Sequence, residues 1–218
     1  MRYNKYRKKE VIILMLKKFA SDALGLSDIG KIIQPEDFDK TQSDDYVLHE
    51  EGEKIHFLIK SKSDEYCFTN LALIHLDGDK ATSSKRNIFR YDYYKYPIKD
   101  VSIETAGTID LDLEIKFKLG EKDISVDIDR KEGEAIADLY KSLVEISLIQ
   151  EDSARMKDYA KESLHISQQL FQDNRFHDGN MANEFEKATT FAYGFLKESY
   201  KENTPKNFSD TFLKYIQN

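Results

Sequence analysis

Hydrophobic and polar positions alternate with a period of two through the middle of the chain. The pattern is clearest over residues 111–119, where Leu, Ile and Phe at odd positions separate Asp, Glu and Lys at even positions. Such alternation is typical of antiparallel strands with one buried face. Further strand-like runs cover residues 55–60, 66–68, 71–76, 85–96, 98–105 and 124–128. The pattern predicts about seven strands between residues 46 and 130, with a hairpin turn at Asp77-Gly78-Asp79.

The period becomes helical on both sides of this region. Residues 15–33 are predicted to form a helix, and residues 35–45 a turn or short helix. After residue 130, Ile136, Leu139, Leu143 and Ile146 form one apolar stripe. The predicted fold is α+β: a curled antiparallel sheet of seven strands, capped at its open end by this helix.

Residues 153–218 contain no strand pattern and predict a helical hairpin with a short third helix at 208–216. Two helices bury little by themselves, so their apolar stripes require the β domain or a second subunit. We expect a homo-oligomer in which the two arms supply the contact. The predicted oligomerisation residues are Leu164 and Phe171 on the first arm, with Phe185, Ala188, Ala192 and Phe195 on the second.

The expected organisation has four parts. Residues 1–14 are interpreted as a leader, because Lys9-Glu10-Val11 can be encoded by a ribosome-binding sequence at a suitable distance before Met15. An N-terminal helix and connector cover 15–45, the β domain covers 46–150, and the hairpin covers 151–218. The apolar run that ends at Lys17-Lys18 is shorter than the ~20 residues that a membrane span needs.

Net charge weighs against nucleic acid as a partner. The chain carries a formal charge of −7; residues 153–218 hold 9 basic and 9 acidic residues, so residues 1–152 carry the whole imbalance. An acidic domain releases few counterions from a polyanion. The lone Cys67 requires no oxidising compartment, so we expect a cytoplasmic protein.

No motif indicates catalysis. The sequence contains no phosphate-binding glycine loop and no nucleophile elbow, and its five histidines are not at metal-ligand spacing. We therefore expect that the protein is not an enzyme and that it binds no cofactor and no metal.

Two ordered motifs resemble the bacterial pleckstrin-homology-like family. They are Phe68-Thr69-Asn70 leading to His75-Leu76-Asp77-Gly78, and Glu104-Thr105-Ala106-Gly107-Thr108 leading to Asp110-Leu111-Asp112. The similarity covers residues 40–148, and the tail is similar to the YvbH-like oligomerisation region. The resemblance implies a seven-stranded barrel with one capping helix and a tendency to self-assemble. It implies no ligand, because a fold does not carry a function.

One segment offers an alternative function. Residues 85–96 concentrate four cations among five aromatic residues, a composition that can bind phosphorylated lipid head groups at a membrane surface. The anion-binding residues would be Lys85, Arg86, Arg90 and Lys95. Ordinary strand packing explains the same alternation, and the acidic domain favours that interpretation. The sequence therefore predicts a non-enzymatic interaction and assembly protein, with a homo-oligomer or another protein as its partner and membrane contact as the alternative.

Overall fold

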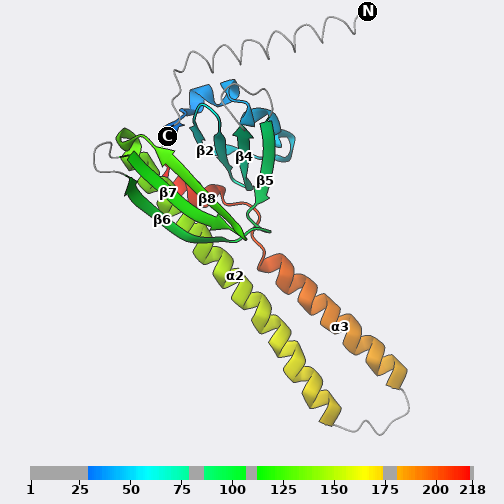
Figure 1. Ribbon diagram of the computed structural model, residues 1–218. Coiled ribbons are helices and arrows are strands. Elements are labelled where there is room, and N and C mark those ends of the chain that lie inside the picture. Colours follow the sequence, from blue (N-terminus) through cyan, green and yellow to red (C-terminus); the bar gives the residue numbers. More distant parts are fainter. Residues whose placement is uncertain (1–28, 79–85, 107–111, 174–180, 217–218) are drawn as a thin grey trace, which may run out of the picture. The chain divides into compact units, whose positions relative to one another are not determined.

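The computed structural model describes residues 29–78, 86–106, 112–173 and 181–216, and within them eight strands form two antiparallel sheets (Figure 1). The first sheet has the order β1-β2-β3-β4-β5 and the second the order β6-β7-β8. The strands are β1 (Lys31–Ile32), β2 (Ile55–Lys60), β3 (Glu65–Thr69), β4 (Ala72–Gly78), β5 (Arg86–Asp92), β6 (Ile98–Ala106), β7 (Asp112–Leu119) and β8 (Lys122–Ile128).

The predicted curled antiparallel barrel or sandwich with a C-terminal helix is found as a two-sheet sandwich, whereas a single sheet of seven strands is wrong in two respects. The structure adds β1, which is too short for a period-two pattern and lies where a helix over 15–33 was expected. Gly30 links the sheets, because its N–H donates to the Asp127 carbonyl oxygen at 2.8 Å. At the other side β5 and β6 do not pair: the amides of Lys95 and Tyr96 donate to the Asp92 carbonyl, which turns the chain between the two strands.

Alternating burial confirms the predicted strands of the second sheet. Ile115, Phe117 and Leu119 on β7 are buried, as are Ile124 and Ile128 on β8. The inner faces of the two sheets meet where the Phe117 ring lies 6.1 Å from that of Phe68. This sandwich is the core of the domain.

The outer face of the first sheet is covered by short 3₁₀ helices. Ile33 and Val47 pack with Leu58, Cys67 and Ile74 to form a second apolar cluster. The first sheet is therefore buried on both sides, which explains why β2–β4 are nearly continuous apolar runs. The helices are η1 (Pro35–Lys40), η2 (Ser43–Tyr46) and η3 (His49–Glu51).

One helix of 41 residues, α2 (Gly133–Asp173), follows the short η4 (Arg130–Glu132). Its first part carries the predicted stripe of Ile136, Leu139, Leu143 and Ile146, all fully buried. Two separate helices were expected here, at 130–150 and from 153. They are one, because Gln150–Ser153 contains no Pro or Gly that could interrupt helical hydrogen bonding.

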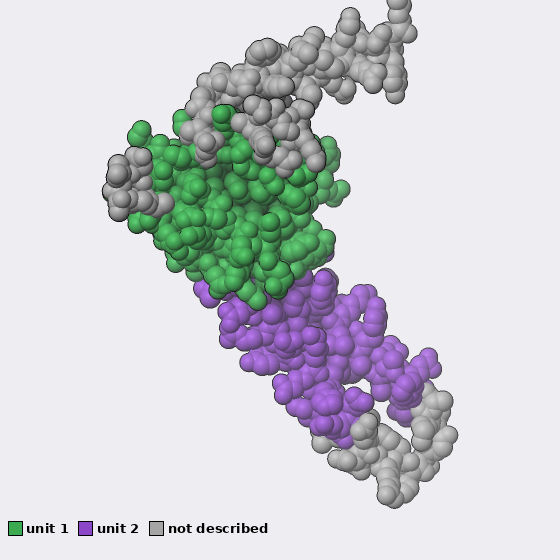
Figure 2. All heavy atoms as spheres, viewed as in Figure 1, with its two compact units in different colours: residues 1–146, 207–218 green, residues 147–206 purple. Residues whose placement is uncertain are grey.

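The chain divides into two compact units, residues 1–146 with 207–218, and residues 147–206 (Figure 2). The second unit contains the end of α2 and α3 (Met181–Glu202), which form the predicted helical hairpin. The last helix, α4 (Ser209–Tyr215), belongs to the first unit rather than to the hairpin domain expected at 151–218. None of the described helices is long and apolar enough to span a bilayer.

Tyr93 explains why α4 belongs to the first unit. Its side chain is 1% exposed and packs against Phe208 and Phe212, at ring distances of 5.8 and 6.3 Å. The Phe208 amide also donates to the Asn70 carbonyl at 2.8 Å. The C-terminal segment thus completes the core of the first unit.

Candidate functional site

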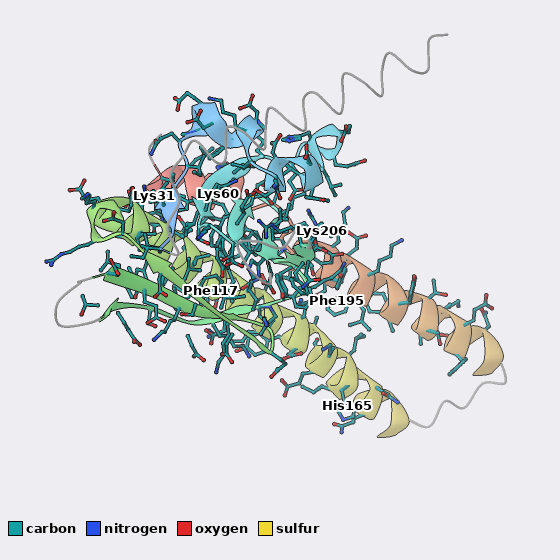
Figure 3. The ribbon with its side chains drawn as sticks, turned by 45° about the horizontal axis from the view of Figure 1, so that its top comes forward. Lys31, Lys60, Phe117, His165, Phe195 and Lys206 are labelled. Carbon is teal, nitrogen blue, oxygen red and sulfur yellow. The ribbon has the colours of Figure 1, made fainter. Side chains whose placement is uncertain are left out.

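The hairpin exposes an unusual amount of aromatic surface. On α3, the predicted residues Phe185, Ala188, Ala192 and Phe195 recur at spacings of three and four and therefore share one face. Phe185 is 72% exposed and Phe195, labelled in Figure 3, is 39% exposed. A single soluble chain rarely leaves such side chains in water.

Three further exposed aromatic residues flank this face of α3, Phe191 on one side and Tyr193 with Tyr200 on the other. Phe191 and Tyr193 are 71% and 70% exposed, Tyr200 is 52% exposed, and the Phe191 ring stacks on Phe195 at 6.3 Å. The sequence interpretation followed one narrow stripe and omitted these flanking positions. The sequence does contain an indication of them. The segment 191–200 holds more aromatic residues than one stripe between two helices can bury.

The first arm, on α2, has an inner and an outer apolar stripe. Ala160 is buried and Leu164, one of the predicted residues, is half-buried, whereas the side chain of the predicted Phe171 lies outside the described part of the structure. The outer stripe is exposed, and sequence reasoning did not separate it from the inner one. It consists of Leu148, Tyr159 and Ile166, which are 56%, 59% and 50% exposed.

The charged residues of the hairpin are paired locally. Lys187 contacts Glu184, Arg155 contacts Glu151, and Lys161 contacts Asp158, each within one helical turn. Such pairs balance the charges within one helix. Lys157 also lies over the Tyr200 ring at 5.8 Å, so charged side chains border the aromatic surface, as they do at the rim of a protein–protein contact.

The basic-aromatic segment at residues 85–96 has a different arrangement. The Arg90 guanidinium donates to Glu53 at 3.0 Å and to Asp92 at 2.8 Å, and Lys95 contacts Asp92 at 2.9 Å. Asp92 raises the pKa of Lys95 through its hydrogen bond and its charge. Two of the four predicted cations are thus neutralised within the domain.

The remaining two cations offer little to an anion. One guanidinium nitrogen of Arg86 is buried against Gly78, and Lys85 lies outside the described residues. Glu53, the acceptor for Arg90, has a fully buried carboxylate that also accepts from Thr69 and from the Leu48 amide. The segment is built as part of the sheet and its supporting polar network.

No metal or thiol centre is evident in the parts of the chain that the structure describes. Their His, Cys, Asp and Glu side chains form no group of three that could hold an ion. Cys67 is fully buried, and burial raises the pKa of its thiol far above the ordinary range. Such a cysteine packs as a small apolar side chain.

Comparisons with known proteins agree with the division into a β domain and a C-terminal hairpin. Residues 23–147 match the bacterial PH domain family, and residues 158–218 match the YvbH-like oligomerisation region. The chain is 49% identical to the uncharacterized protein YvbH of Bacillus subtilis (strain 168), over 94% of this chain and 100% of the relative. It is also similar to a crystal structure of a PH-domain-containing protein from Exiguobacterium sibiricum 255-15, with 47% identity, a TM-score of 0.79, and coverage of 87% of this chain and 100% of that one.

Proposed function

The chain belongs to the bacterial PH domain family and carries a YvbH-like oligomerisation region, and from this premise we propose that it is a non-enzymatic assembly protein that self-associates through its hairpin. The contact surface is the aromatic face of α3 together with the outer stripe of α2. The observation that carries the proposal is the exposure of Phe185, Phe191 and Tyr193, each about seven-tenths accessible. All three lie within the residues that match the oligomerisation region.

Energetics favour a second copy as the occupant of this surface. Full burial of one large apolar side chain contributes about 1.5–3 kcal/mol, and the two arms offer several such side chains. A second hairpin provides matching apolar faces, so packing of two hairpins buries both sets at once. Residues 153–218 hold 9 basic and 9 acidic residues, so net charge adds little repulsion between copies.

We expect a double substitution on α3 to dissociate the assembly. Phe185→Asp with Phe195→Asp places two charges in the interface, where removal of water from an unpaired carboxylate is costly. The measurement is the solution mass of the full chain by light scattering. The variant should be smaller than the wild type by at least a factor of two.

Lys201→Asp is the matched control, because Lys201 has none of these aromatic residues three or four positions away, has a side chain that is 78% exposed, and receives the same new side chain. Its mass should equal that of the wild type. Circular dichroism should show equal helix content in all three proteins. A wild type that is already monomeric, or a double variant with unchanged mass, would refute the proposal.

A further inference from the structure

A recess of about 160 Å³ lies in the first unit, and segments far apart in the sequence line it. Its described walls come from β1 and η1, from β2, from the start of α2 and from the residue that follows α4. Protein interiors leave few voids larger than a water molecule. No described residue of the hairpin lines the recess, so it is separate from the proposed assembly surface.

Most of the wall of this recess is apolar. Ile33, Phe57 and Ile216 are buried side chains of the wall, and Phe38 is a half-buried one. A single water needs only about 10–15 Å³, whereas an apolar cavity of about 150 Å³ holds one benzene molecule. The size and the lining of the recess therefore suit one small aromatic ring.

His56 places an unused polar atom at this apolar wall. The residue is 6% exposed, and its Nε2 lies 2.9 Å from Ser209 Oγ. When Nε2–H donates to Ser209, Nδ1 is left as an acceptor. No described residue donates to Nδ1, and this atom is not among the fully enclosed unpaired atoms of the described structure. It is therefore accessible to a small molecule in the recess.

Asp138 is the second polar residue of the wall, and it indicates the charge of the ligand. One of its carboxylate oxygens accepts from Lys141 at 2.8 Å, and its side chain is 33% exposed. The carboxylate repels an anion, and the ion pair with Lys141 already balances the charge that would attract a cation. The polar groups of the recess are thus acceptors that favour a neutral O–H or N–H donor.

We propose that this recess binds a small neutral aromatic alcohol of the phenol class. The ring occupies the apolar part, and the hydroxyl group donates to His56 Nδ1. The C-terminal segment completes the site, because Ile216 forms part of its wall and Ser209 engages the other nitrogen of His56. The segment after the hairpin thus has a role in binding as well as in the core of the first unit.

Fluorine NMR of the full chain tests the proposal with two probes of similar size. One is para-fluorophenol, which carries the donor, and the other is para-difluorobenzene, in which fluorine replaces the hydroxyl group. The phenol should bind saturably. The difluoro compound should bind about tenfold more weakly, because it leaves the buried acceptor unpaired. Equal affinities of the two probes, or no saturable binding of the phenol, would overturn the proposal.

A matched pair of variants locates the binding. Ala135→Leu adds a larger side chain at the wall of the recess and should abolish binding of para-fluorophenol. Ala154→Leu makes the same change at an exposed position of the same helix and should leave the affinity unchanged. Undiminished binding by an Ala135→Leu variant with a native circular dichroism spectrum would place the ligand elsewhere and refute the site.

Two further variants keep the test independent of how well Ala135→Leu folds. His56→Phe retains a ring but removes the acceptor, so the two probes should bind with similar affinity. An unchanged preference for the phenol would exclude His56 as its partner and sink the proposal. Phe185→Asp with Phe195→Asp should retain binding, because the hairpin does not line the recess. Loss of binding in this double variant would instead assign the phenol to the aromatic surface of α3.

Discussion

Single residues show how tertiary contacts change the burial and the pKa of a side chain. His56 on β2 is 6% exposed. Its Nε2 lies 2.9 Å from Ser209 Oγ, and its ring stacks on Phe212 at 5.2 Å. Burial, with a smaller effect of Lys54, lowers the pKa of the ring below its ordinary value of 6.5.

This lowered pKa predicts a loss of stability in mild acid. The folded protein favours the neutral ring, so the unfolded chain takes up the proton first as pH falls. The His56 contribution is complete above pH 6.5 and is lost as the pH falls from there toward the lowered folded value. Urea unfolding between pH 7 and pH 5 should show this fall, and His56→Gln should make it shallower. Equal slopes for the two proteins would contradict it.

Arg90 shows why residue composition alone cannot identify an anion-binding site. The cations and rings of residues 85–96 have the composition of an anion site, but the structure pairs Arg90 with a buried carboxylate 37 positions earlier, Glu53. No local pattern reports such a distant partner. The residue types therefore showed which side chains could bind an anion. They did not show that Arg90 is already paired with carboxylates of its own domain.

Among the elements, the short helix α4 makes many packing and hydrogen-bond contacts for its length. It has seven residues, yet Thr211 and Phe212 are buried in the first unit, and Lys214 and Tyr215 both donate to Glu145 on α2. An isolated helix of this length is unstable in water. Its order therefore depends on the contacts it makes with β2, Tyr93 and the start of α2.

Two adjacent substitutions measure this dependence. Phe212→Ala should lower the free energy of unfolding by about 3 kcal/mol, because it removes a fully buried ring and leaves a cavity. Leu213→Ala is the control, since Leu213 is 59% exposed, and it should change stability little. Chemical denaturation of the full chain measures both. Similar losses in the two variants would indicate that α4 does not pack as described.

For the molecule as a whole, the two compact units have different surfaces. The first unit buries Phe68, Tyr93 and Phe212 in its own core, whereas the second leaves Phe185 and Phe191 about seven-tenths exposed. The proposed assembly contact therefore belongs to the hairpin.

Substitutions at exposed apolar positions of the two units should therefore change the solution mass differently. Phe185→Asp with Phe195→Asp should give a smaller assembly, whereas Leu213→Ala, at a position 59% exposed on the first unit, should leave the mass unchanged. Light scattering of the full-length proteins at one concentration measures both. A smaller mass for Leu213→Ala would contradict the assignment of the contact to the hairpin.

Local pattern alone determined most of the elements. The strands at 112–119 and 122–128, the buried stripe from Ile136 to Ile146 and the apolar face of α3 follow from periodicity, because each buries one face at fixed spacing. The family resemblance, and with it the likeness to PH domains and an oligomerisation region, was also present in the motifs. These features depend on neighbours close in sequence.

Tertiary structure alone decided the features that depend on distant partners. It split the strands into two sheets, added β1 through Gly30, and returned α4 to the first unit against Tyr93. It also exposed the outer stripe of α2. Strand order and ion pairing arise from contacts across tens of residues, and such contacts leave no periodic trace in a single sequence.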